Sequence, residues 1–132
     1  MADKKTPSKK ARKADLPTAH ILDALHDVIL ARKGGDPALS NTARLFARGR
    51  AKIAQKVGEE AVEAVIEGVR GDAAKLAEES ADLLYHLLVL WADVGLKPAE
   101  VYAILQDRSG ISGIEEKKGR KDREAGAAET EG

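Results

Sequence analysis

The sequence contains no cysteine, and this absence removes several classes of function. Without a thiol there is no cysteine nucleophile, no disulfide framework, and no zinc or iron–sulfur site built on cysteine ligands. The apolar stretch from Leu83 to Ala92, interrupted by His86, is too short to span a bilayer, and no signal peptide is visible. We therefore expect a cytoplasmic protein in a reducing compartment, without a membrane partner.

Aromatic residues are scarce as well, at 3% of 132 residues. No stretch alternates apolar and polar residues as a half-buried strand would. The apolar residues, 43% of the chain, are mostly Ala, Leu, Val and Ile, and the four prolines fall outside the periodic apolar runs. Prolines in such places mark helix boundaries. The composition therefore predicts an all-α fold.

Neither sign of charge is in excess, since 22 Lys and Arg balance 22 Asp and Glu, so the overall charge gives no reason to expect a nucleic-acid partner. Basic residues are concentrated near the N-terminus, where they could form an arm that touches RNA or a membrane, or a solubilising tail. The composition favours the tail. We predict a disordered basic arm over residues 1–17, an all-α domain over 18–110, and a charged, mostly disordered tail over 111–132.

Four helical segments are expected from apolar residues spaced at i, i+3 and i+4 and from the capping residues beside them. They span about 18–32, 40–69, 73–94 and 98–107. Asp72 and Gly95 are the expected caps of the third segment. Gly49 and Gly58 within the second indicate either a soft break with a close approach, or simple tight packing. His20 and His26 lack partners at ligand spacing and are expected as surface or rim residues rather than ligands.

The second segment is apolar over more than half of its circumference. One arc is expected to face the core and contains Phe46, Ile53, Val57, Ala61, Ala64 and Val65. Val62, Ile66 and Val69 extend this arc toward the far side, and so short a chain cannot easily cover both sides from within. We therefore predict a homodimer, or a dimer of dimers, in which helical hairpins form a bundle.

Two acidic pairs carry most of the chemical information. Glu60 and Glu63 form the first pair, Glu79 and Asp82 the second, and each pair lies on one helical face because its members are three residues apart. Gly71 and the residues around it can turn the chain back between the pairs. An antiparallel hairpin would then bring four carboxylates together, and a hard cation with oxygen ligands, usually Mg²⁺, would compensate their charge.

The competing interpretation is that these acids form a solvated stripe, as charged helix faces usually do. Three features favour a cation site. The pairs flank one turn and border the most apolar arcs, and the acids at 59, 60, 63 and 67 repel one another along two helical turns. Lys56 relieves part of this repulsion from one turn before Glu60.

Basic residues and one histidine complete the candidate site. Four basic residues recur at four-residue spacing: Arg44, Arg48, Lys52 and Lys56. A polyphosphate substrate would need such a series, and the competing interpretation is a solubilising surface. His86 lies one turn after Asp82 and could orient it, act as a base, or simply close the helix pair.

Three strings resemble the phosphoribosyl-ATP pyrophosphohydrolases, which belong to the all-α nucleotide pyrophosphohydrolases related to MazG and the dimeric dUTPases. The strings are residues 42–46 (TARLF), 53–60 (IAQKVGEE) and 79–90 (ESADLLYHLLVL). The similarity extends over about residues 19–119, and the last two strings are more specific than the superfamily signature of Glu-x-x-Glu followed by Glu-x-x-Asp.

The resemblance implies a chain of four to five helices that hydrolyses 1-(5-phosphoribosyl)-ATP to the corresponding AMP and pyrophosphate in histidine biosynthesis. It also implies that Mg²⁺, with Mn²⁺ as a substitute, is bound by Glu60, Glu63, Glu79 and Asp82. Glu59 would be an additional ligand or a neighbour of the ligands, Lys56 would face phosphate, and either Glu59 or Glu63 could take the proton from the attacking water. The alternatives are a MazG-type house-cleaning enzyme for nucleoside triphosphates and a non-enzymatic helical dimerisation module.

Overall fold

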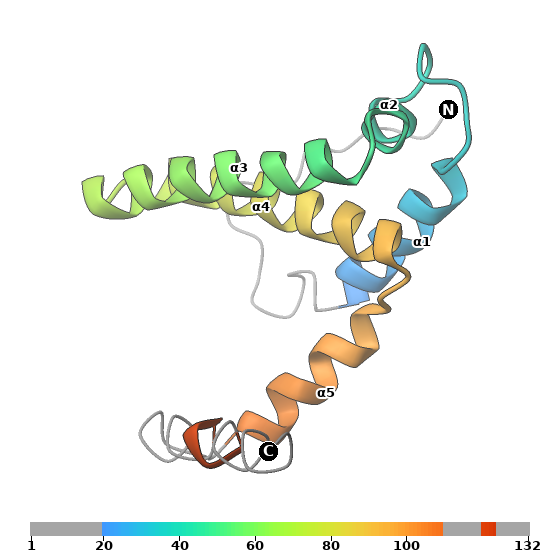
Figure 1. Ribbon diagram of the computed structural model, residues 1–132. Helices are drawn as coiled ribbons and strands as arrows, with labels where there is room; N and C mark the ends of the chain where they lie inside the picture. The colour runs from blue at the N-terminus through green and yellow to red at the C-terminus, as the bar shows by residue number, and fades with distance from the viewer. Residues whose placement is uncertain (1–19, 110–119, 124–132) are drawn as a thin grey trace, which may run out of the picture. The chain divides into compact units, whose positions relative to one another are not determined.

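Figure 1 shows the computed structural model of the chain, in which residues 20–109 and 120–123 are described. Within these ranges there are five main helices, a short helical stretch at residues 120–123, and no strand, which confirms the all-α prediction. The helices are α1 (His20–Arg32), α2 (Asn41–Arg48), α3 (Arg50–Arg70), α4 (Ala73–Val94) and α5 (Pro98–Arg108). The predicted arm, residues 1–17, lies outside the described residues, and so does most of the predicted tail.

Local sequence signals set most of the helix ends. The Oγ atom of Ser40 accepts a hydrogen bond from the Ala43 amide at 3.2 Å, so α2 begins where its capping residue predicts. Asp72 caps α4 in the same way through the Lys75 amide, and Gly95 closes α4 in the left-handed conformation. The ends expected for the first, third and fourth segments agree with α1, α4 and α5 to within one or two residues.

The single helix expected over residues 40–69 is wrong, because two helices, α2 and α3, occupy this range. The break falls at Gly49, whose φ of +92° is not helical and is rarely adopted by residues with a side chain. Gly58, by contrast, stays inside α3. A Cβ atom added at Gly58 would meet nothing within 4 Å, so no neighbour approaches closely there. Of the two glycines, only Gly49 marks a change of direction.

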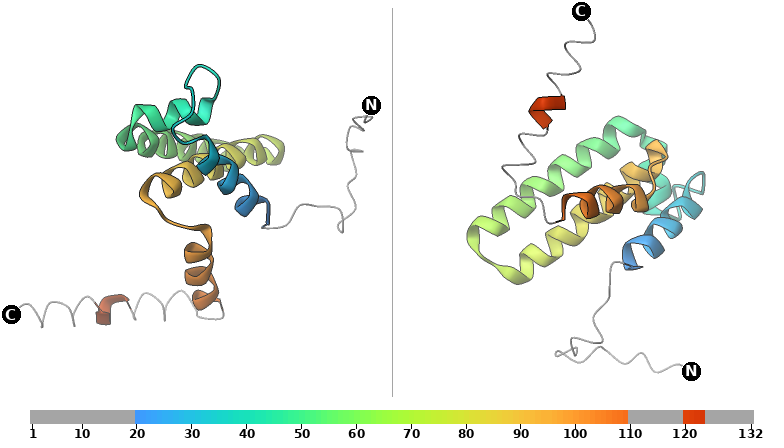
Figure 2. Two further views of the ribbon diagram at one scale, coloured as in Figure 1. Left: turned by 90° about the vertical axis from the view of Figure 1, so that its right-hand side faces the viewer. Right: turned by 90° about the horizontal axis from the view of Figure 1, so that it is seen from below.

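Helices α3 and α4 form the predicted antiparallel hairpin and lie side by side in all the views (Figures 1 and 2). Gly71 makes the turn with φ +73°, and its N–H donates to the carbonyls of Glu67 and Gly68 at 3.0 and 3.2 Å. The turn is therefore compact enough to bring residues from both sides of it face to face.

The hydrophobic core lies at the open end of this hairpin, where α1 and α2 pack. It comprises Ile29, Leu45, Ile53, Leu88, Val89 and Ala92, all at most 4% exposed. Arg50 and Asp93 join the two hairpin helices at the same end, with 2.7 Å between Nε and Oδ2. Four helices thus contribute to one core, and α3 enters it near its first residues.

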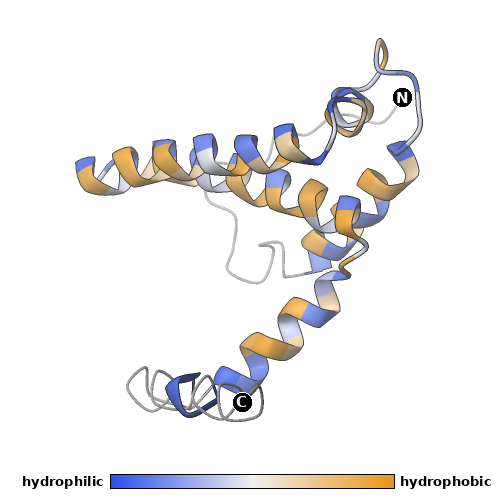
Figure 3. Ribbon diagram, in the orientation of Figure 1, coloured by the Kyte–Doolittle hydropathy of each residue, from blue (hydrophilic) through white to orange (hydrophobic). Residues whose placement is uncertain are grey.

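The turn end of the hairpin presents apolar side chains at the surface, and apolar segments are visible along the ribbon there (Figure 3). Val62, Ile66 and Val69 are 60%, 44% and 85% exposed, so they lie outside the first core as expected. Val65 was expected on the core face, yet it is 63% exposed. That expectation was wrong because α1 and α2 reach only the other end of the hairpin.

His26 is also a correction, since its side chain was expected at the surface or rim and is buried at 5% exposure. It shares the inner face of α1 with Ile29, and its Nε2 atom is buried without a hydrogen-bond partner among the described residues. His20 is exposed as expected. No helix in the described ranges is long and apolar enough to cross a membrane.

The chain divides into two compact units after Pro98. The second unit contains most of α5, in which Pro98 occupies the first helical position and Glu100 lies in the first turn. Residues 120–123, within the tail predicted over residues 111–132, are helical. The remaining residues of the predicted tail lie outside the described ranges.

Candidate metal centre

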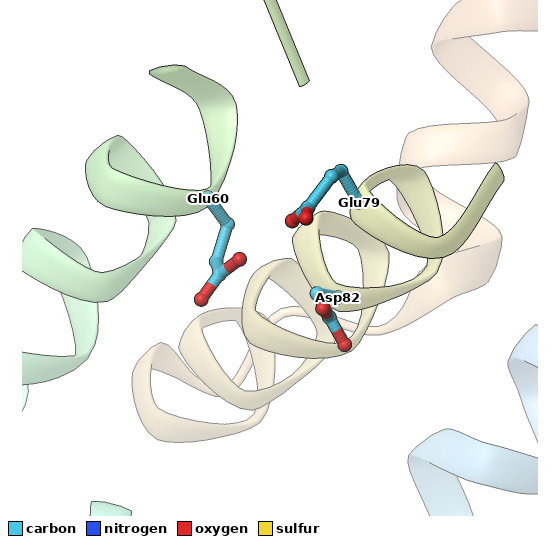
Figure 4. Close-up of side chains that lie close together, drawn as sticks. All are labelled: Glu60, Glu79 and Asp82. Carbon is cyan, nitrogen blue, oxygen red and sulfur yellow. The ribbon is translucent and has the colours of Figure 1, made fainter. Parts of the chain in front are cut away.

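The candidate site lies in the hairpin of the first unit, between the Gly71 turn and the core. Glu60 projects from α3, and Glu79 and Asp82 project from α4 (Figure 4). One carboxylate oxygen from each of these three residues lies within 4.8 Å of the other two. The side chains that the sequence spacing placed together therefore converge in the structure, and the hairpin turn brings this about.

Glu63 lies against this cluster, one turn after Glu60 on α3. It is within hydrogen-bonding reach of both Glu60 and Glu79, and these contacts contribute to raising the pKa of each. All four predicted acidic residues are thus neighbours, three of them with oxygens placed to share one ion. We use the term acid cluster for Glu60, Glu63, Glu79 and Asp82.

Ionisation of all the carboxyl groups in the acid cluster is energetically unfavourable. Hydrogen bonding with Glu63, then burial, then the charges of the other acids raise the pKa of Glu79 to about 7. Burial first, and then Glu63, raise the pKa of Glu60, while His86 acts in the opposite direction. Carboxyl groups that share one site cannot all ionise freely, so near neutral pH the cluster binds a proton or requires a cation.

Two carboxylate oxygens of the cluster lack protein partners, as atoms that bind a cation would. Oε2 of Glu60 and Oε2 of Glu79 are shielded from solvent, and neither has a hydrogen-bond partner among the described residues. Burying such an atom without a partner is unfavourable. An ion such as Mg²⁺ prefers oxygen ligands, and the cluster supplies oxygens alone. The donor set and the unpartnered oxygens both suit a hard divalent cation.

His86 is buried beside the acid cluster, at 8% exposure. Its Nδ1 atom lies 2.7 Å from the main-chain oxygen of Asp82, so Nδ1 donates to a carbonyl rather than to the Asp82 carboxylate. The ring also meets Tyr85 edge-on, with 5.1 Å between ring centroids. The hydrogen bond fixes the orientation of the ring and leaves Nε2 without the proton while the ring is neutral.

Glu59 lies apart from the acid cluster, although the sequence placed it among the candidate ligands and bases. Its two oxygens accept hydrogen bonds from Gln55 Nε2 at 2.9 Å and from Lys56 Nζ at 3.1 Å, both on its own helix. These bonds, that of Gln55 first, lower the pKa of Glu59. A lowered pKa makes a carboxylate a weaker base, so the local environment of Glu59 does not favour proton transfer.

The four predicted phosphate-binding residues do not form one continuous row, because the break at Gly49 separates them. Arg44 and Arg48 belong to α2, whereas Lys52 and Lys56 belong to α3. Arg44 reaches the Pro37 carbonyl at 3.4 Å, and Lys52 reaches Gln55 at 3.3 Å. The basic side chains are therefore presented by two differently directed helices.

A contact between distant segments was missed in the sequence. Thr42 Oγ1 and Tyr85 OH are hydrogen-bonded at 2.5 Å and join α2 to α4. Both residues lie in strings that resemble the family, but no residue spacing within one helix links positions 43 residues apart. The one indication of this contact in the sequence was the position of Thr42, a polar residue on the otherwise apolar inner face of a short helix.

The chain is similar to known proteins over most of its length. The family model for phosphoribosyl-ATP pyrophosphohydrolase matches residues 22–109, a range that includes the whole acid cluster. The chain is 65% identical over 104 residues to a phosphoribosyl-ATP pyrophosphatase of Azospirillum brasilense, covering 79% of this chain and 94% of the relative.

Two further relatives carry the same description. That of Paramagnetospirillum magneticum is 61% identical over 100 residues, which cover 76% of this chain and 92% of the relative. That of Gluconobacter oxydans is 53% identical over 107 residues, or 81% and 80% of the two chains. With a matched range of this length and identities at this level, the chain belongs to the phosphoribosyl-ATP pyrophosphohydrolase family.

Proposed function

We propose that this protein hydrolyses 1-(5-phosphoribosyl)-ATP to 1-(5-phosphoribosyl)-AMP and pyrophosphate, a step of histidine biosynthesis, and that the reaction depends on Mg²⁺. The observation that carries the proposal is the family match over residues 22–109, which spans the converging carboxylates. A reaction between polyphosphate and water needs a cation beside the scissile bond, and the acid cluster is suited to hold one.

Within this proposal Glu60, Glu79 and Asp82 hold the ion, and Glu63 completes the set from the next turn of α3. Their converging oxygens support this assignment. Bound Mg²⁺ would supply charge stabilisation of the leaving pyrophosphate and a lower pKa of a nearby water. His86 supports Asp82 by fixing the main chain at its carbonyl.

We assign the proton-accepting role to Glu63 rather than Glu59. Glu63 lies against Glu60 and Glu79, where the attacked phosphate would be held. Glu59 is occupied by Gln55 and Lys56 on the outside of α3. A general base must lie within hydrogen-bonding reach of the water that it deprotonates, and the position of Glu63 meets this requirement.

Basic side chains would neutralise the remaining phosphate charge. Lys56 is nearest in sequence to the acid cluster and pairs with Glu59 at 3.1 Å, an exposed ion pair that a phosphate group can readily replace. Lys52, Arg48 and Arg44 extend the positive charge toward α2. Such a series suits an elongated substrate that carries phosphates at more than one place.

We further propose that two copies of the chain associate as a homodimer, or as a dimer of dimers. Val62, Ile66 and Val69 form an exposed apolar surface on α3, and an apolar face of this kind is stabilised by burial against a partner helix. Sedimentation equilibrium at micromolar protein is the direct test. A well-folded monomer under those conditions would exclude the assembly.

The decisive experiment for activity is pyrophosphate release from three substrates, phosphoribosyl-ATP, ATP and dUTP, each with Mg²⁺ and with EDTA. We expect the highest kcat/KM for phosphoribosyl-ATP and no release in EDTA. A preference for ATP or dUTP would instead indicate a house-cleaning enzyme, and the absence of metal-dependent release would exclude both. Glu60→Gln protein, purified in parallel, controls for contaminating phosphatases.

A further inference from the structure

Helix α2 is a short element whose position is not set by the helix that follows it. It has 8 residues, too few to be stable alone in water. At Gly49 the chain leaves the helical conformation, with φ +92°, before α3 begins at Arg50. The direction of α2 therefore depends on what its inner face contacts, not on continuity with α3.

The inner face of α2 makes two kinds of contact. Ala43 and Leu45 are buried at 2% and 4% exposure, and hydrophobic contact of this kind is not directional. Thr42 is also buried, at 7% exposure, and its hydroxyl bonds to Tyr85 OH on α4 at 2.5 Å. Among the described residues this is the one side-chain hydrogen bond between α2 and α4. Because hydrogen bonds require alignment, it fixes the position of α2 along α4.

The two helices joined by this bond carry the two parts of the proposed site. Helix α4 carries Glu79 and Asp82, while α2 carries Arg44 and Arg48. Tyr85 also lies beside the acid cluster, since its ring packs edge-on against His86 with an interplanar angle of 82°. A shift of α2 along α4 would therefore move the arginines relative to the metal-binding carboxylates.

We propose that Thr42 and Tyr85 are positioning residues for substrate binding, whose hydrogen bond holds the arginines of α2 at a fixed place relative to the acid cluster. This inference rests on the proposed function, because the arginines matter to a substrate whose phosphates reach both places. Neither hydroxyl touches the reacting atoms. Their effect is transmitted through the position of Arg44 and Arg48 on α2.

Removing either hydroxyl should weaken substrate binding more than chemistry. Tyr85→Phe keeps the ring and its edge contact with His86, and Thr42→Val keeps the shape of the side chain. Each single change leaves the other hydroxyl without its partner at a part-buried position, which loosens the docking of α2. The carboxylates on α3 and α4 stay in place, so the bound substrate should react at a nearly normal rate.

The test compares four variants with wild type in steady-state pyrophosphate release from phosphoribosyl-ATP. We expect Thr42→Val and Tyr85→Phe each to raise KM by about tenfold and to change kcat by less than about twofold. Thr42→Ser, which retains the hydroxyl, should restore KM to near the wild-type value. The double variant should be no worse than the worse single variant, because both ends of one bond are then absent.

A core variant separates positioning from a general loss of stability. Ile29→Val also removes buried contacts, but on α1, and its KM should stay at the wild-type value even where its melting temperature falls as far as that of Thr42→Val. The Mg²⁺ concentration at half-maximal rate should be the same in all variants. That readout reports on the acid cluster rather than on α2.

Three results would overturn the inference while leaving the proposed function intact. These are unchanged KM in Thr42→Val and Tyr85→Phe, a loss of kcat in place of a rise in KM, and an equal rise of KM in Ile29→Val. Wild-type protein that releases no pyrophosphate from phosphoribosyl-ATP would refute the proposed function, and this inference with it. The two failures are therefore distinguishable in one set of assays.

Discussion

The two ends of the α3–α4 hairpin differ in what they bury. At the open end, Ile53, Leu88 and Val89 are at most 1% exposed, and α1 and α2 cover them. At the turn end, Val62, Val65 and Val69 are at least 60% exposed. Glu60 and Glu63 of the acid cluster flank Val62 in the sequence, so the cluster belongs to the part of the hairpin whose apolar residues are uncovered.

This difference suggests a division of tasks along one pair of helices. The open end stabilises the folded unit through close packing of apolar side chains, and the acid cluster lies outside this end. The part toward the turn end is less stable in an isolated chain. Its carboxylates have raised pKa values, and its apolar residues are exposed to water, and both are unfavourable. A metal ion, a substrate or a second subunit can recover that loss.

The largest effect is expected from the acid cluster. Glu60→Gln and Asp82→Asn should each lower kcat by about a thousandfold, because an ion that stabilises transition-state charge loses a ligand. The metal-free fold should be intact or slightly more stable, since repulsion is relieved. Pyrophosphate release and circular dichroism check the two halves of this prediction. A variant that retains more than about a tenth of wild-type kcat would show that its residue is not a metal ligand.

The next effect concerns stability at the open end. Leu88→Ala should lower the free energy of unfolding by about 3 kcal/mol, because Leu88 is 1% exposed and its removal leaves a cavity in the core. The loss should be the same at low and high protein concentration. Urea titration at two protein concentrations is the measurement. A concentration-dependent loss would place Leu88 at a subunit interface rather than in the core.

At the turn end, the effect should depend on assembly instead. Ile66 is 44% exposed in the single chain, so Ile66→Asp has little reason to unfold it. In a dimer the new carboxylate would be buried without a partner and should weaken association by at least about a hundredfold. Sedimentation equilibrium should then show monomers or aggregates at micromolar protein. Unchanged association would locate the interface elsewhere.

A smaller effect follows from the pKa of Glu79, which is raised from 4.5 to about 7, and that of Glu60, which is also raised. Groups that bind protons more tightly when folded add stability below their unfolded pKa, and that stability is lost as the pH rises through the folded pKa. These groups should therefore make metal-free protein less stable as the pH rises from about 4.5 to beyond 7. Mg²⁺ at ten times its Kd should add about 1.4 kcal/mol above that range.

Melting temperatures measured between about pH 5 and pH 8, in EDTA and in Mg²⁺, test both statements. Glu79→Gln is the matched control, because it cannot titrate and should flatten the pH dependence of the metal-free protein. If Glu79→Gln follows the same pH dependence as wild type, Glu79 is not the group responsible. An acid stripe exposed to solvent would show neither effect.

The smallest effect is expected from Glu59, despite its place beside Glu60 in the sequence. Its oxygens are bonded to Gln55 and Lys56, away from the acid cluster. Glu59→Gln should lower kcat by less than about threefold, whereas Glu63→Gln should lower it by about a hundredfold or more. Reversed magnitudes in the same pyrophosphate assay would assign the proton-accepting role to Glu59.

Features set by neighbouring residues in the chain could be predicted from the sequence. Asp72 and Gly95 bound α4 because a side chain at the first and a left-handed glycine at the second satisfy free backbone groups locally. The acid cluster was predictable for a similar reason. Three-residue spacing fixes a helical face, and Gly71 determines that the two faces meet.

Features set by packing between distant segments could not be predicted. Gly49 and Gly58 carry the same helix penalty, and only the docking of α2 makes Gly49 the break. Val65 fits the apolar arc of α3, but no helix of its unit reaches it. Polar side chains usually lie at the surface, which is why His26 was expected there. Its burial depends on the packing of other helices against the inner face of α1, which the sequence of α1 does not reveal.

The break at Gly49 also divides the proposed site between two structural elements. All four acids belong to one uninterrupted hairpin, whereas two of the four basic residues belong to a helix joined to it through a single non-helical residue. Under the proposed function, a substitution in α2 would change the phosphate-binding side chains and leave the spacing of the carboxylate oxygens as it is.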